Sequence, residues 1–170
     1  GSSVASPERI RGAVRIVLEA SKKDKLLVVV SAFQGITDKL LECARAAERG
    51  DVTYQTQFNL IADRHWGTAK ALHGNKIPKA LAEKIQQLLN DLHDVLHGVY
   101  LLRHCPPRGF DLTASFGERL SALIISSFVN KKHPSHFADA RNFVVTDDQF
   151  MHAEVLFEQT NSAIQKYFKQ

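Results

Sequence analysis

The sequence opens on small residues that can approach an anion. Gly1, Ser2 and Ser3 come directly before a helix that we expect to begin after Ser6, a good N-capping residue. Small residues there let backbone N–H groups reach a phosphate at the positive end of the helix dipole. Gly-Ser-Ser is also a common remnant of an expression tag, so a functional and an accidental origin both stay open.

A second segment of this kind, residues 31–37, reads Ser-Ala-Phe-Gln-Gly-Ile-Thr. Ser31 and Ala32 follow an apolar run, and ligands of open α/β sheets bind beyond the carboxyl ends of strands. Gly35 can bring a backbone N–H group close to an anion. The Thr37 hydroxyl can hydrogen-bond a substrate or simply cap the next helix.

The third segment, residues 115–122, reads Ser-Phe-Gly-Glu-Arg-Leu-Ser-Ala and is expected to be helical. Gly117 inside a helix costs about 1 kcal/mol relative to alanine, which indicates a packing or access requirement. The carboxylate of Glu118 can bind a substrate ammonium group. The alternative is a surface pair with Arg119, but adjacent helix residues point about 100° apart, which favours a functional role for Glu118.

A metal site is the fourth possibility. His93 and His97 lie at i and i+4, as in the zinc-binding pattern H-E-x-x-H, and His104 is the nearest third ligand. Aspartate replaces the glutamate of that pattern, and a two-ligand match has a high false-positive rate. We therefore interpret the histidines as a polar flank and predict no bound metal.

These segments need elements that position them. Residues 26–30 read as a buried strand and residues 135–140 as a second strand. Helical spacing of apolar residues predicts helices over 7–20, 37–48, 54–73, 78–103, 112–129 and 153–168. Alternation of strands and helices predicts an α/β fold, layered, with a largely parallel sheet flanked by helices.

Composition narrows the function classes. The chain has 170 residues, 44% of them hydrophobic, which suits one domain with one core. Its net charge is +4, but no basic run is interleaved with aromatic residues, so we expect no nucleic-acid partner. No apolar run approaches the ~20 residues of a membrane helix, so we expect no membrane partner. Two cysteines and no signal-peptide pattern predict a cytoplasmic protein.

Taken in order, the motifs resemble those of the aspartate kinase family, within the amino-acid kinase superfamily. The chain starts on Gly-Ser-Ser-Val, similar to the end of the family's K-F-G-G-[ST]-S-V. Residues 31–37 resemble S-A-x-x-G-[IV]-T, and residues 115–121 resemble S-x-G-E-[RK]-[LM]-S. Residues 145–154 resemble a later segment, T-[DN]-[DN]-x-[FY]-x-x-A. Four collinear matches over nearly the whole chain make coincidence a poor explanation.

The resemblance implies transfer of the γ-phosphoryl group of MgATP to the side-chain carboxylate of L-aspartate. This step begins lysine, threonine and methionine synthesis. Thr37 and Glu118 would bind aspartate, Glu118 through the ammonium group. Ser31, Ala32 and Gly35 would lie near the phosphates, and residues 1–3 would help to hold the transferred group.

The resemblance also implies that residues 1–170 are the N-terminal, aspartate-binding part of an amino-acid kinase domain. The helices over about 51–107 would be an insertion within it. The remainder of the kinase, with its nucleotide half and regulatory domains, would be a partner, and a homo-oligomer is possible. We expect the fragment alone to be inactive. One alternative is a non-catalytic helical interaction or regulatory module derived from a kinase half. The other is a related amino-acid kinase acting on glutamate or a carbamate, against which the S-x-G-E match argues.

Overall fold

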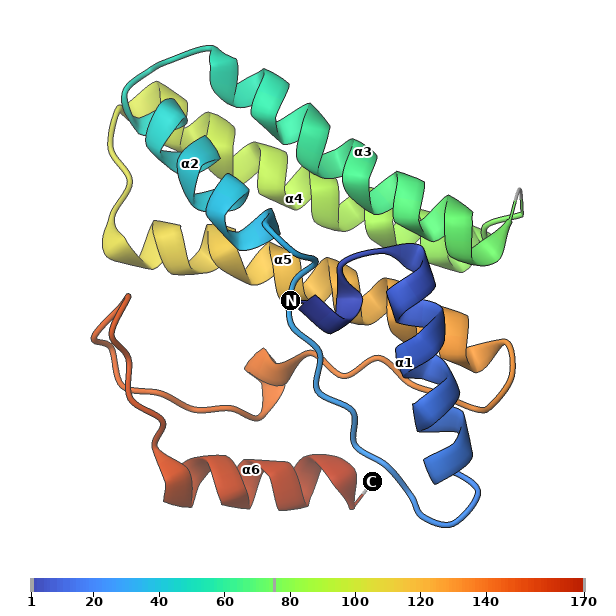
Figure 1. Ribbon diagram of the computed structural model, residues 1–170. Coiled ribbons are helices and arrows are strands. Elements are labelled where there is room, and N and C mark those ends of the chain that lie inside the picture. The colour runs from blue at the N-terminus through green and yellow to red at the C-terminus, as the bar shows by residue number, and fades with distance from the viewer. Residues whose placement is uncertain (1, 75, 170) are drawn as a thin grey trace. The chain divides into compact units, whose positions relative to one another are not determined.

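The computed structural model describes residues 2–74 and 76–169, and helices dominate them (Figure 1). The elements, in chain order, are η1 (Ser2–Val4), α1 (Pro7–Ala20), α2 (Ile36–Glu48), α3 (Thr53–His73), α4 (Lys79–Leu102), α5 (Pro107–Asn130), η2 (Ala140–Asn142) and α6 (Phe157–Phe168). The chain forms two compact units, Gly1–His136 and Phe137–Gln170. No helix in the described ranges is both long and apolar enough to cross a membrane.

The predicted parallel sheet is wrong for this chain. In the described ranges, extended pairing is limited to one isolated antiparallel bridge between Thr146 and Val155. Residues 26–30 form an irregular connection instead of a buried strand, and Val29 is 88% exposed. Residues 135–140 are also irregular up to the start of η2. A strand needs a neighbour for its backbone N–H and C=O groups, and the described residues offer no such strand to either segment.

The predicted helices are confirmed, with shifts at their ends. In α1, the Ser6 side chain accepts a hydrogen bond from Arg9 N at 3.3 Å and a proline occupies the first helical position. Both features favour helix initiation. Ile10 and Val14 supply the buried face of this helix. The last predicted helix starts at Phe157 instead of about residue 153.

The first unit is a helical layer with α2 at its centre. α2 packs against α3, α4 and α5 (Figure 1). Its alanine-rich face is fully buried. Small residues let neighbouring helices approach closely, whereas the facing stripe of α4 consists of large apolar residues. That stripe comprises Leu81, Ile85, Leu89, Leu92, Leu96 and Val99.

The turn between α4 and α5 is fastened to the end of α2. Arg103 ends α4 in the left-handed conformation and donates a hydrogen bond to Arg49 O at 3.0 Å. Cys105 N donates to the Glu48 carboxylate at 3.0 Å. Gly50 has φ of +66°, and a Cβ atom there would collide with the Arg103 guanidinium. The turn after α4 is thereby held against the end of α2 and the loop that leads from α2 to α3.

The second unit is organised around α6. Thr160 donates its hydroxyl proton to Val145 O at 3.1 Å and accepts from Val145 N at 2.9 Å. Phe143 packs against Tyr167, with ring centroids 4.9 Å apart, and against Phe168 at 5.5 Å. These contacts fold residues 143–156 onto the helix that follows them.

Candidate functional site

Gly117 lets two of the sequence motifs touch. It lies in α5, and a Cβ atom at this position would be 2.9 Å from Ala32 Cβ and 3.2 Å from Leu40 Cδ1. Contacts that short do not occur between real side chains without displacement of one partner. The glycine predicted to have a packing reason therefore has one. Residues 31–37 rest directly on α5 because this position carries no side chain.

Two hydrogen bonds fix the loop at that contact. Glu118 Oε1 accepts from Ala32 N at 3.3 Å, and Ser121 Oγ donates to Ser31 O at 2.8 Å. Both bonds join residues more than eighty positions apart in the chain. The Glu118 side chain is half-buried, and Arg119 lies over the Phe116 ring at 4.7 Å. Glu118 therefore faces the loop of the second motif, and its role in binding a substrate stays a prediction.

Gly35 has the conformation that its type predicts. Its φ is +75°, a left-handed value that glycine adopts without strain, and it is the N-cap of α2. The predicted cap at Thr37 is wrong, because α2 begins at Ile36 and places Thr37 in the first turn. Thr37 is half-buried. Its hydroxyl is thus carried by the positive end of the helix that starts at the loop.

A histidine that the sequence analysis did not select supports this loop from behind. His65, in α3, is fully buried, and its ring centroid lies 5.3 Å from that of Phe33. Its Nδ1 atom lies 2.7 Å from Ile61 O, a distance that places the proton on Nδ1. Burial lowers the pKa of His65 to about 4. The ring that packs against Phe33 is therefore neutral. The only signal for His65 in the sequence was its place in the predicted helix over residues 54–73.

The N-terminal motif is less informative. Gly1 lies outside the described residues. Ser2 and Ser3 form the exposed turn η1, where Ser2 O accepts from Arg9 Nη1 at 2.9 Å. Within residues 2–74 and 76–169, no hydrogen bond joins these serines to residues 31–37 or to Glu118. Their role near the phosphates stays a prediction.

Residues 145–154, the last of the four segments that resemble the family, form a turn in the second unit. Asp147 accepts hydrogen bonds from Gln149 N and Glu154 N, each at 3.1 Å, on the same carboxylate oxygen. Asp147 N donates to Glu154 O at 3.1 Å, which closes the turn. Residues 145–154 are therefore ordered by their own polar side chains.

The histidine pair of α4 is part of a stack of rings. The ring centroids of His93 and His97 lie 6.0 Å apart, and the ring planes are nearly parallel. The Tyr54 hydroxyl oxygen lies 3.1 Å from His97 Nδ1. Phe58 packs against the edge of His93. Across the described parts of the chain, no group of three His, Cys, Asp or Glu side chains could hold a metal ion. The rings connect α3 with α4 as packing groups.

Replacing Gly117 with alanine tests the close contact. Overpacking costs typically 1–3 kcal/mol, against a gain of about 1 kcal/mol in helix propensity, so we expect a net loss of about 1 kcal/mol. Gly98→Ala is the matched control, because Gly98 is also helical and has open space around its Cα. That variant should gain about 0.5–1 kcal/mol. Urea unfolding of both variants measures the difference, and equal effects would contradict the packing role.

Comparisons with known proteins identify the family of this chain. The model of the amino acid kinase family matches residues 1–170. The chain belongs to the amino acid kinase family. Among curated members, it is 31% identical over 172 residues to aspartokinase 2 and 32% identical over 171 residues to aspartokinase 3, both chloroplastic enzymes of Arabidopsis thaliana. Each alignment covers 98% of this chain but only 30% and 29% of those proteins.

Solved structures of this family give the same result. Aspartokinase III of E. coli, in complex with lysine and aspartate in the T-state, superposes with a TM-score of 0.84 at 24% identity. The R-state of that enzyme, with aspartate and ADP, gives 0.80 at 25%. The alignments cover 98% and 99% of this chain and 36% of each structure. The predicted resemblance to aspartate kinases is confirmed, and the chain spans about a third of the proteins that it resembles.

Proposed function

We propose that this chain is the aspartate-binding part of an aspartate kinase. The observation that carries the proposal is the contact between the two motifs, in which Glu118 accepts from Ala32 N and Gly117 admits the loop. Aspartate kinase relatives cover nearly all of the chain and supply the reaction. An oxygen of the aspartate side-chain carboxylate attacks the γ-phosphorus of ATP. The bond to the bridging oxygen breaks, leaving ADP and 4-phospho-L-aspartate.

The residues of this chain would act mainly by positioning. Glu118 gives one oxygen to the loop, and we assign its negative charge to the substrate ammonium group. Thr37 would hydrogen-bond the substrate from the first turn of α2. Ser31, Ala32 and Gly35, with residues 1–3, would border the phosphates. Phosphoryl transfer depends on such positioning and on charge neutralisation, so no nucleophile from the protein is needed.

The co-substrate is proposed to be MgATP, with the magnesium ion entering on the nucleotide. The part of the chain that the structure describes has no cluster of metal-binding side chains to which the ion can be assigned. Magnesium would neutralise charge on the transferred phosphoryl group. Assembly with the remainder of a kinase, or into a homo-oligomer, also belongs to the proposal. A cytoplasmic location also belongs to the proposal, although the curated relatives named above are chloroplastic enzymes.

The second candidate is a non-catalytic helical module derived from a kinase half. Its support is the predominance of helices in the described residues. Hydroxylamine converts an acyl phosphate to a hydroxamate, so the natural full-length protein should form aspartyl hydroxamate from MgATP and L-aspartate. A full-length protein that forms none would favour the non-catalytic module.

The 170-residue chain alone is expected to give no aspartyl hydroxamate. It spans about 30% of the aspartokinase relatives, and we assign most of the groups that would stabilise the transferred phosphoryl group to the remainder of the kinase. The measurement is the same assay with the purified chain, beside the full-length protein as a positive control. Turnover by the chain that rises in proportion to its concentration would contradict the expectation.

A further inference from the structure

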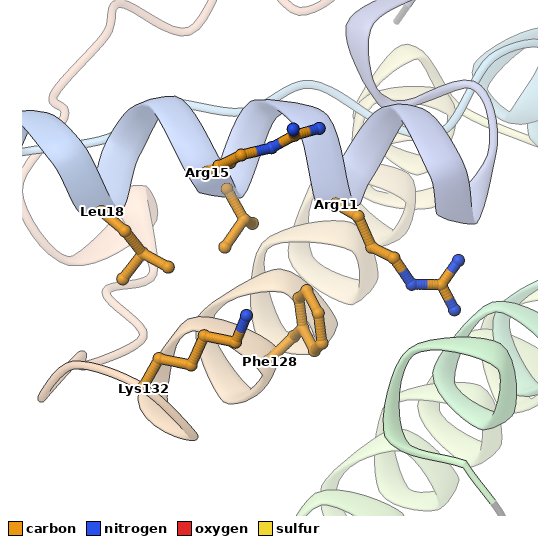
Figure 2. A pocket seen from close by; sticks show the side chains of 6 residues that line it. Arg11, Arg15, Leu18, Phe128 and Lys132 are labelled. Carbon is orange, nitrogen blue, oxygen red and sulfur yellow. The ribbon is translucent and has the colours of Figure 1, made fainter.

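The second half of α1 and the end of α5 border a hollow that the proposed aspartate site does not use. The hollow has a volume of about 360 Å³ (Figure 2). Its lining consists of Arg11, Val14, Arg15, Leu18, Phe128 and Lys132. Sites for small molecules begin at about 300 Å³. Phe128 follows Glu118 by ten residues on the same helix, roughly 15 Å along its axis, so the two places are distinct.

The inner wall of the hollow is apolar. Val14 from α1 and Phe128 from α5 are buried, and Leu18 is half-buried beside them. Figure 2 shows the Phe128 ring on α5 below Leu18 and Arg15 of α1. A ligand seated there would cover hydrocarbon, which favours a molecule with an apolar body.

The rim carries positive charge from α1 and from the segment just after α5. Arg15 of α1 and Lys132, just after α5, are both exposed, and the lining contains no acidic side chain. Glu19, one turn after Arg15, pairs with Lys22 at 2.8 Å. In residues 2–74 and 76–169, neither Arg15 nor Lys132 forms an ion pair. Two cations that form no ion pair, beside an apolar wall, favour an anionic ligand.

A further lysine next to Phe128 adds positive charge beside the hollow. Lys131 lies over the Phe128 ring at 5.9 Å, and His73 packs edge-on against the same ring at 6.0 Å. Burial and the positive charge of Lys131 lower the pKa of His73. His73 is consequently neutral near pH 7, and the charge beside the hollow comes from arginine and lysine alone.

We propose that this hollow binds a small organic anion in which a compact, doubly charged group, such as a phosphate monoester, is attached to an apolar body. The charged group would lie between Arg15 and Lys132, where the two cations neutralise it. The apolar body would cover Val14, Leu18 and Phe128. The site lies away from residues 31–37 and Glu118, so its ligand would be additional to aspartate and ATP.

Phenyl phosphate is the probe, added to the 15N-labelled 170-residue chain in buffer without phosphate. Amide shifts are expected in the second half of α1 and at the end of α5. Inorganic phosphate lacks the apolar body and phenol lacks the charge, so each should bind at least tenfold more weakly. Arg15→Gln and Lys132→Gln should each weaken phenyl phosphate about tenfold. Lys84→Gln, at an exposed lysine of α4, is the matched control and should bind as the unmodified chain does.

Three results would overturn the proposal. Equal binding of inorganic phosphate and phenyl phosphate would show a merely electrostatic patch. Unchanged affinity in both glutamine variants would remove the charged rim from the site. Tighter binding of hexaglutamate at the same amides would assign the hollow to an acidic polypeptide. The spectrum of each variant reports its fold directly. The two cations come from separate parts of the chain, so one variant suffices if the other is perturbed.

Discussion

Replacing Glu118 with glutamine in the full-length protein should raise the KM for aspartate about tenfold or more. Glutamine keeps an oxygen that can accept from Ala32 N, so the loop contact survives. What it loses is the negative charge assigned to the substrate ammonium group, and a charge-assisted hydrogen bond contributes about 1.5–3 kcal/mol. The KM for ATP and the melting temperature should change little. Steady-state kinetics and thermal unfolding of this variant provide the measurement.

Succinate makes the test specific for the ammonium group. Succinate is aspartate without its amino group, so the unmodified protein should bind aspartate more tightly than succinate. The Glu118→Gln variant should lose most of that preference, which a double-mutant comparison isolates. Glu118→Ala is the structural comparison, because it also removes the acceptor of Ala32 N and should lower the melting temperature. A purely structural Glu118 would instead leave the aspartate KM unchanged in both variants.

The helices could be predicted from local signals, and the sheet could not. Ser6 and Pro7 start α1 as predicted because capping depends on neighbouring residues only. Residues 26–30 have the apolar, β-branched composition of a strand, yet they form an irregular connection. Composition states that a segment suits a sheet, whereas strand formation depends on a partner elsewhere. No partner strand exists in the described residues.

The candidate site, like the fold, could be predicted only in part from local signals in the sequence. The cost of a glycine inside a helix predicted a packing or access requirement at Gly117. Only the structure shows that the requirement is the close contact with Ala32. The predicted importance of Glu118 is compatible with its contact to Ala32 N, which no local pattern could reveal. Ser121 was within the motif without a role of its own, and its bond to Ser31 O gives it one. Patterns of local residue spacing cannot predict contacts between residues more than eighty positions apart in the chain.

The buried His65 should make the protein lose stability in mild acid. Its pKa is about 4 in the folded protein, against about 6.5 in the unfolded chain. Because the unfolded chain binds the proton first, the free energy of unfolding falls as pH decreases from about 6.5 to about 4. The loss from this residue amounts to about 3 kcal/mol and is complete below that range. Urea unfolding at pH 7.5, 5.5 and 4.5 measures it.

His65→Phe isolates the contribution of this residue. Phenylalanine keeps a ring against Phe33 and cannot be protonated, so the variant should lose much less stability between pH 7.5 and 4.5. His73 remains in the variant, and its lowered pKa leaves a smaller slope of the same sign. If the free energy of unfolding depended equally on pH in the two proteins, the pKa of His65 would be the same in the folded and unfolded chains.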